Sequence, residues 1–314
     1  MWIVYFHNVI AGPLDAFDPW LSRLSPEEFA RQVELLVRRL RPVPLREILE
    51  RHAAGEDDPD AVAVTFDDGY RGVLTHAAPI LAAAGVPATV FVVTESLERE
   101  PGSLFHYEEV EMAFRLTEAT DLEAELLGER LPLHTFLDRL RAMKRLKKIF
   151  KLLPEAGRRA WHAEILARLG VTPQACRAAA AGREEPYAVL DRAELLRMID
   201  AGWTVGSHTR THRTLSQLGG DELKQEIQGA RADLERHLGL AGAIPLAYPY
   251  GQPEHVGPRA PAEAAAAGHG GAFTTVPERV TPASDRFLLP RLEFSELYQA
   301  VSQTPPGLRP STIT

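Results

Sequence analysis

Cysteine is nearly absent from this chain, which has only Cys176 in 314 residues. A single cysteine forms no internal disulfide and supplies no cysteine-rich zinc site, so we expect Cys176 to be an unreactive, packed side chain. Such low cysteine use is typical of proteins from a reducing compartment.

Long hydrophobic runs are also missing. No stretch approaches the roughly 18 apolar residues that a membrane-spanning helix needs. The first residues, MWIVYFHNVIAGPLDAF, show neither the basic start nor the apolar run of a secretory signal peptide. We therefore expect a soluble, cytoplasmic protein without a transmembrane segment.

Basic residues are in deficit, because 35 Lys and Arg stand against 43 Asp and Glu and the formal net charge is −8. This balance disfavours general binding of nucleic acid, whose phosphates attract proteins with a basic excess. The chain is nonetheless 45% hydrophobic, which is too apolar for a disordered protein. We expect a folded protein with no nucleic acid partner.

Short apolar runs alternate with helical patterns along most of the chain. The runs predict strands at residues 2–6, 61–66, 88–93, 203–207, 244–248, 271–275 and 287–289. Helices are predicted at 26–40, 75–84, 191–201, 221–238 and 261–267, the first with Ser25 as N-cap and Glu28 completing a capping box. This alternation favours parallel βα units in an α/β barrel, whose functional residues lie at the carboxyl ends of the strands.

Residues 101–186 interrupt the alternation with long helical patterns. One apolar stripe recurs at spacings of three and four residues: Phe136, Leu140, Met143, Leu146, Phe150 and Leu153. Because such a stripe has to be buried and the barrel is the nearest apolar surface, we expect a helical insertion beside the barrel. The chain would then be one domain over 1–314.

A basic run accompanies that stripe. Residues 139–159 contain nine basic side chains and one acidic side chain, Glu155. The run would suit a surface for an anionic glycan, a phospholipid head group or a partner protein, and it would equally suit the solvated face of an amphipathic helix.

Two adjacent carboxylates end the second predicted barrel strand, in the segment Thr65-Phe66-Asp67-Asp68-Gly69-Tyr70. Neighbouring carboxylates in different environments can divide their roles, so that one binds a metal and the other takes a proton. Asp and Gly are also ordinary turn residues, so the segment alone leaves a simple turn open.

Two histidines, His208 and His212, follow the strand at 203–207 in the segment SHTRTH. Imidazoles four residues apart can converge on one cation, and imidazole with carboxylate suits Zn²⁺ and related divalent ions. Exposed loop histidines are the alternative. A third strand end, LAYPYG, contains Pro249 and Tyr250, where a pocket wall and a backbone N–H facing an oxyanion are possible beside a merely packed turn.

Taken in order, TFDDGY, SHTRTH and YPYG resemble the first three motifs of the polysaccharide deacetylases of carbohydrate esterase family four, the NodB-homology domain. The resemblance implies a deformed (β/α)7 barrel that removes N-acetyl or O-acetyl groups from sugars with a divalent metal, zinc first and cobalt or nickel as alternatives. It also implies Asp67 as general base and Asp68, His208 and His212 as metal ligands.

The chain departs from the family pattern at three places. Ala247 stands where the family usually has an arginine that holds the base carboxylate, and neither an Asp-x-x-Asp-Trp motif nor a carboxyl-terminal Leu-x-His is present. Arg291, after the last predicted strand, is a candidate replacement for that arginine. We group it with Tyr250 and Pro249 as residues on the substrate and oxyanion side of the site.

His7 is the candidate general acid, because cleavage of a C–N bond needs a proton for the leaving amine. The segment Phe6-His7-Asn8-Val9 ends the first strand, whose neighbours in a closed barrel are the second and the last strands. It also resembles the Tyr-His-x-Val start of one family branch, in which the amino-terminal histidine takes the acid's role. A structural hydrogen-bonding role is the alternative.

The sequence thus predicts a metal-dependent deacetylase of an acetylated glycan or sugar precursor. Two further hypotheses stay open: a hydrolase of another C–N bond in a small molecule, and a non-catalytic glycan-binding module that keeps the metal. The basic helix at 139–159 would offer a possible surface contact.

Overall fold

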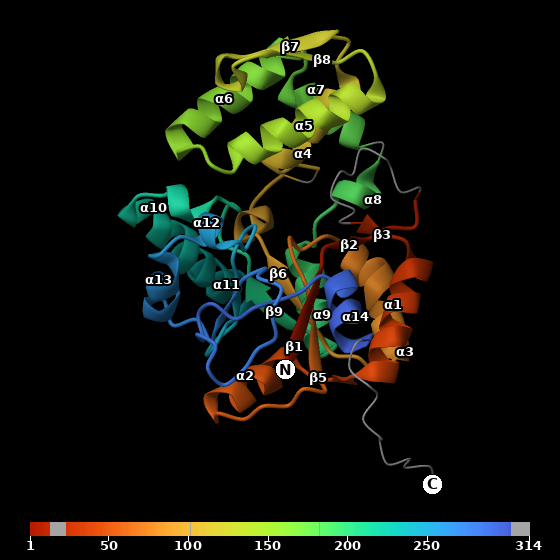
Figure 1. Cartoon of the computed structure of the whole chain (residues 1–314), viewed down its shortest axis with the longest axis vertical. Helices are drawn as coiled ribbons and strands as arrows, with labels where there is room; N and C mark the ends of the chain where they lie inside the picture. Colours follow the sequence, from red (N-terminus) through yellow and green to blue (C-terminus); the bar gives the residue numbers. More distant parts are fainter. Residues whose placement is uncertain (13–22, 101, 182, 303–314) are drawn as a thin grey trace.

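The computed structural model describes residues 1–12, 23–100, 102–181 and 183–302. A parallel sheet surrounded by helices forms one part of the molecule, and the segment expected as an insertion stands at one end of it (Figure 1). None of the helices in the described residues combines the length and the apolar character needed to cross a membrane.

Seven parallel strands form the central sheet. Its order is β1-β5-β6-β9-β10-β11, with β4 paired to β5. The strands are β1 (Trp2–Phe6), β4 (Arg41–Pro42), β5 (Ala61–Phe66), β6 (Ala88–Val92), β9 (Thr204–Ser207), β10 (Leu246–Ala247) and β11 (Ala272–Phe273). The strands β5 and β6 are buried along their whole length, as expected for strands covered on both faces. The fold is the predicted deformed (β/α)7 barrel.

The barrel closes through single bridges. The expected strand at 287–289 is wrong as a strand: Leu289 forms an isolated parallel bridge to Phe273, and Leu292 forms one to Val4. The segment between them therefore spans the space from β11 to β1, with hydrogen bonds from the Tyr5 N–H to the Leu292 carbonyl (3.0 Å) and from the Thr274 N–H to the Leu289 carbonyl (2.8 Å). Pro290 in this segment has no N–H to continue a ladder.

Helices cover the outside of the sheet: α1 (Pro26–Arg39), α2 (Leu45–Ala53), α3 (Ala78–Ala83), α9 (Arg192–Asp200), α10 (Gly220–Lys224), α11 (Ala230–Leu238), α12 (Pro253–Val256), α13 (Ala260–Ala266) and α14 (Phe294–Ser302). Ser25 caps α1 as predicted, since its hydroxyl accepts from the Glu28 N–H at 3.1 Å. The second hydrogen bond of the predicted capping box, from the Ser25 N–H to the Glu28 carboxylate, is wrong. The Glu28 carboxylate instead binds Arg31 and Gln32.

Two predicted helices contain π-helical turns. The pattern at 75–84 becomes a π turn, Val73–Ala77, followed by α3, and the pattern at 221–238 becomes α10, a π turn at Gln225–Gly229 and α11. A separate two-stranded parallel sheet pairs β2 (Asn8–Val9) with β3 (Arg23–Leu24).

The insertion has a hydrophobic core of its own. Its helices are α4 (His106–Leu116), α5 (Phe136–Phe150), α6 (Glu155–Arg168), α7 (Pro173–Ala181) and α8 (Glu184–Tyr187), and an antiparallel hairpin, β7 (Asp121–Glu123) with β8 (Arg130–Pro132), was not predicted. Met143, Leu146 and Phe150 are buried among other residues of the insertion, such as Trp161 and Val110. The expectation that the stripe packs on the barrel is therefore wrong, because the insertion's own helices cover it. Phe136, at the start of α5, is 44% exposed.

Candidate active site

The sequence motifs meet at one end of the barrel because each follows a parallel strand. His7 follows β1, Asp67 and Asp68 follow β5, His208 follows β9, and Tyr250 lies just beyond β10. The β1–β5 register pairs Phe6 with Phe66, and the Asp67 N–H donates to the Phe6 carbonyl at 2.9 Å. His7 and Asp67 are therefore neighbours across two adjacent strand ends.

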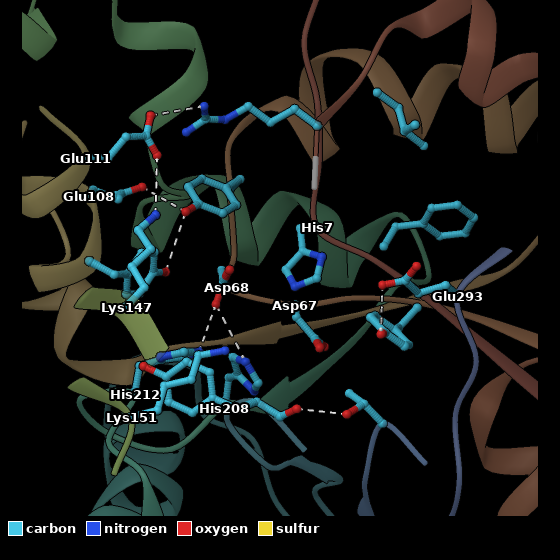
Figure 2. Close-up of a pocket in the computed structure, with 18 of the residues that line it drawn as sticks. His7, Asp67, Asp68, Glu108, Glu111, Lys147, Lys151, His208, His212 and Glu293 are labelled. Atoms are coloured by element: carbon cyan, nitrogen blue, oxygen red, sulfur yellow. Dashed lines mark hydrogen bonds and ion pairs between the residues drawn. The ribbon is translucent and has the colours of Figure 1, made fainter. Parts of the chain in front are cut away.

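These side chains line a cavity of about 480 Å³. The barrel contributes His7, Asp67, Asp68, His208, His212 and Tyr250 to its wall, and the insertion contributes His106, Tyr107, Glu108, Glu111, Lys147, Phe150 and Lys151. Figure 2 shows Asp68, His208 and His212 gathered together, with His7 and Asp67 beside them. The cavity is thus bounded by both parts of the molecule, and its volume is in the range of small-ligand sites.

Asp68, His208 and His212 could hold one metal ion, since one ligand atom from each lies within 4.8 Å of the others. The Asp68 Oδ1 atom lies 3.5 Å from His208 Nε2 and 3.4 Å from His212 Nε2. His208 Nδ1 donates to the Ala247 carbonyl at 2.8 Å, which turns Nε2 and its lone pair toward Asp68. A carbonyl partner of this kind typically orients a metal-binding histidine.

The protonation states of these three groups fit a cation. Burial lowers the pKa of His208 to about 4 and also lowers that of His212, so both imidazoles are neutral near pH 7. Burial and the Asp67 charge raise the pKa of Asp68, and its Oδ1 atom is buried without a hydrogen-bond partner. A bound cation would supply that partner and favour the ionised carboxylate, and one carboxylate with two imidazoles is a suitable zinc ligand set.

Asp67 is held by Arg291 rather than by a residue of the third motif. The Arg291 Nη1 and Nη2 atoms donate to the two Asp67 oxygens, both at 2.8 Å, and Nε donates to the Thr274 carbonyl at 3.1 Å. Burial alone would raise the pKa of Asp67, but the Arg291 charge and hydrogen bonds outweigh it and lower the pKa to about 2. Asp67 is therefore ionised at neutral pH.

The same contacts contradict the prediction that Arg291 lies on the substrate side of the site. Arg291 is fully buried and its guanidinium is committed to Asp67, Thr65 and Thr274, so it does not line the cavity as a substrate contact. Its position nevertheless matches the replacement that the sequence indicated for the arginine absent at Ala247.

Backbone strain is concentrated around the cavity. Among the described residues, the non-glycine residues with positive φ are Asp68 (69°), Thr209 (62°), His212 (58°) and Tyr250 (62°). Such conformations are unfavourable for residues with a Cβ and persist where the surrounding structure fixes them. Two of the four are candidate metal ligands, and this distribution supports a functional role for the region.

Tyr250 lines the cavity and Pro249 does not. The Tyr250 ring packs against the His212 ring, with centroids 4.8 Å apart. Within the described part of the chain, the Tyr250 N–H donates to no protein acceptor, so it is available to an oxygen of a ligand. Pro249 is buried behind it, and its carbonyl accepts from the Gly251 N–H at 2.7 Å.

Sequence reasoning missed the residues that α4 brings to the cavity. The Tyr70 hydroxyl donates to the Glu108 carboxylate at 2.7 Å, and the Tyr107 ring lies 5.3 Å from the His212 ring. Burial raises the pKa of Glu108 to about 7. The run Phe105-His106-Tyr107-Glu108-Glu109 was the available signal, because aromatic and acidic residues there precede an apolar helix.

A second group of potential metal ligands is explained by ion pairs. Glu98, Asp233 and His237 also lie close enough to share an ion. Arg236 binds both carboxylates at 2.6 Å, and Arg210 Nε lies 3.2 Å from Asp233. The negative charge of Glu98 and Asp233 is thus already balanced by arginines, in contrast to that of Asp68.

Comparison with known proteins agrees with this geometry. The family model described as polysaccharide deacetylase matches residues 54–116 and 165–269, more than half of the chain. Residues 117–164, between the two matched ranges, lie within the insertion. No curated protein matched the chain.

Several solved structures share the fold. A Streptococcus pyogenes deacetylase, PplD, in complex with acetate is 15% identical, with a TM-score of 0.59 over 96% of this chain and 97% of its own. IcaB from Ammonifex degensii is 18% identical, with a TM-score of 0.57 over 96% and 97%. A de-N-acetylase from Aggregatibacter actinomycetemcomitans is 15% identical, with a TM-score of 0.57 over 95% and 98%. With the family match and the motif geometry, these similarities lead to one conclusion: the chain belongs to the polysaccharide deacetylase family.

Proposed function

We propose that this protein is a metal-dependent hydrolase that removes acetyl groups, N-linked first and O-linked as an alternative, from a sugar or polysaccharide. The observation that carries the proposal is the position of Asp68, His208 and His212 beside an ionised Asp67 in one cavity. Zinc is the expected metal, with cobalt or nickel as alternatives. When bound, such a cation supplies Lewis-acid chemistry that polarises a carbonyl and lowers the pKa of water.

Asp67 is the proposed general base. Its carboxylate is ionised and oriented by two hydrogen bonds from Arg291, so it is ready to accept the proton of an attacking water. The low pKa makes it a weak base in isolation, which is compatible with catalysis only where the water itself is acidified. This role therefore depends on the neighbouring metal ligands.

Tyr250 is the proposed oxyanion residue. Its N–H has no protein acceptor in the described residues, and its ring touches His212, so the amide lies near the place where an acetyl oxygen would gain charge. Preorganised donors of this kind typically contribute strongly to acyl transfer. Pro249 supports the turn that presents this amide.

His7 is the proposed general acid. Its ring lies beside Asp67 at the cavity wall (Figure 2). The ring also packs edge-on against Tyr5, with centroids 5.8 Å apart. A protonated imidazole at this place would donate its proton to the leaving nitrogen.

The decisive test is acetate release from acetylated amino sugars and oligosaccharides, with and without added Zn²⁺, Co²⁺ or Ni²⁺. We expect metal-stimulated release in the wild type and a loss of at least about 10²-fold in Asp67→Asn. Release of ammonia or another product would favour a different C–N hydrolase. Glycan binding without any turnover would favour a non-catalytic module. The cytoplasmic location stays a prediction, to be checked by cell fractionation.

A further inference from the structure

One wall of the cavity is cationic and comes from the insertion. Lys147 in the last turn of α5 and Lys151 just after it both line the cavity (Figure 2). Lys144 and Lys148 of the same segment are instead exposed to solvent. The basic run at 139–159 therefore has one part in the cavity wall and another part exposed to solvent. Only the cavity part can meet a substrate bound at the site.

The two cavity lysines differ in their surroundings. Lys147 is buried, and its Nζ atom lies 3.7 Å from the Glu111 carboxylate, which also binds Arg115 at 3.0 Å. The Lys151 Nζ atom lies 4.5 Å from the centroid of the Tyr250 ring, in a cation–π contact. Lys147 is thus part of a charge network inside the insertion, while Lys151 faces the cavity across an aromatic ring.

Lys151 is close to the reaction centre. The Tyr250 ring that it contacts is the same ring that packs against His212. One aromatic ring therefore separates the ammonium group from a candidate metal ligand. A sugar whose acetyl group lies at Asp68 and His212 would present its other substituents toward Lys151.

Burial sets the charge balance of Lys151. Burial and the neighbouring Lys147 charge lower the pKa of Lys151 to about 8, although the Glu254 charge acts in the opposite direction. The surroundings of Lys151 therefore disfavour, on balance, the positive charge that an anionic ligand would stabilise. An ammonium held in such a place typically gains more from an anionic ligand than an exposed lysine does.

We propose that Lys151 determines substrate specificity by binding an anionic substituent, a carboxylate or a phosphate, of the acetylated sugar. The proposal rests on the deacetylase function above and narrows its substrate class from neutral glycans to acidic ones. A charged hydrogen bond of this kind corresponds to about a 10- to 100-fold preference in kcat/KM for the acidic sugar.

The test compares one neutral and three acidic sugars on the full-length, zinc-loaded protein. The neutral probe is N-acetylglucosamine, and the acidic probes are its 1-phosphate, its 6-phosphate and N-acetylmuramic acid. The three acidic probes distinguish a glycosyl phosphate, a phosphate elsewhere on the ring and a carboxylate. Lys151→Met removes the charge, Lys151→Arg keeps it, and Lys148→Met is the matched control on the exposed side of the same segment.

We expect wild type, Lys151→Arg and Lys148→Met to prefer at least one acidic probe by about 10-fold or more in kcat/KM. The preference is the ratio of kcat/KM for the acidic and the neutral probe within each variant, and Lys151→Met should lose it. Raising the salt from about 20 mM to 500 mM should weaken the preference in wild type and have no such effect in Lys151→Met. Equal rates for neutral and acidic probes, or a preference that survives in Lys151→Met, would overturn the proposal.

Binding separates this proposal from the deacetylase function itself. If no probe releases acetate, calorimetric binding of the same four probes to the metal-free protein decides. Tighter binding of an acidic probe to wild type than to Lys151→Met would support the anion site while the hydrolase proposal fails. Equal binding of all four would overturn it. If circular dichroism shows that Lys151→Met folds poorly, Lys151→Gln replaces it as the uncharged variant. The salt dependence of the wild-type preference then gives a second, independent measurement of the same charge interaction.

Discussion

The barrel and the insertion contribute to one cavity in different ways. The barrel supplies its residues from the ends of parallel strands, where register fixes His7 beside Asp67 and places His208 against Asp68. The insertion supplies its residues from helices packed around a separate core. The barrel thus supplies the candidate metal ligands, base and acid, and the insertion supplies another part of the cavity wall. Substitutions at the strand ends of the barrel are therefore expected to change activity, and substitutions in the insertion core are expected to change stability.

The largest effect is expected at Asp67. Asp67→Asn should reduce acetate release by about 10²- to 10⁴-fold, because the proposed base is lost. Zinc content, measured on the purified variant, should stay at the wild-type value, since the candidate ligands are other residues. Substantial activity in this variant would move the base to another group.

The insertion core should respond in stability. Leu146 is fully buried in that core, so Leu146→Ala should lower the free energy of unfolding by about 2–5 kcal/mol. Chemical denaturation measures this loss. The folded variant should keep its zinc, because all three candidate ligands belong to the barrel. Loss of zinc from a folded Leu146→Ala protein would show that the two regions are not separable.

His7→Ala tests the barrel side of the cavity further. We expect amide turnover to fall by about 10²-fold with unchanged zinc content, because the leaving amine lacks its proton donor. An activated ester needs less protonation of its leaving group and should lose less activity. A variant with full amidase activity would leave His7 with a structural role only.

The smallest expected effect concerns Glu108, where the insertion meets the barrel. Burial raises the pKa of this carboxyl to about 7, so the native state keeps a proton that the unfolded chain has lost. This contribution to stability is present at low pH and is lost as the pH rises through 7. Glu108→Gln cannot ionise, so its stability relative to wild type should improve by about 1–2 kcal/mol between pH 5 and pH 8.

Thermal unfolding of the zinc-loaded proteins at both pH values checks this difference. Tyr70, which donates to the same carboxylate, offers a control in Tyr70→Phe, which keeps the ionisable group. A Glu108→Gln difference that is the same at pH 5 and pH 8 would contradict the raised pKa.

Much of the barrel site was predictable because its residues are local in sequence. Asp67 with Asp68 and His208 with His212 follow recognisable strands, and parallel strands bring their ends together. The sequence indicated Arg291 only because the arginine that the family usually has is replaced by Ala247. The structure shows its contact with Asp67 across 224 positions, a pairing that periodicity does not specify.

The rest depended on packing between distant segments. The stripe at Met143 and Leu146 predicted a buried helix face correctly, but the pattern does not say which surface buries it. Likewise, the basic run does not distinguish Lys151 in the cavity from Lys148 in solvent. The prediction of a last strand at 287–289 is wrong because single bridges and Pro290 stand where a strand would form a hydrogen-bonded ladder.

The central claim is that Asp68, His208 and His212 hold one divalent ion in the barrel. The most direct measurement is the zinc content of the His208→Ala, His212→Ala double variant, compared with Asp67→Asn, which leaves all three ligands in place. We expect about one zinc per chain in wild type and in Asp67→Asn, and none in the double variant. A folded double variant with full zinc occupancy would contradict it.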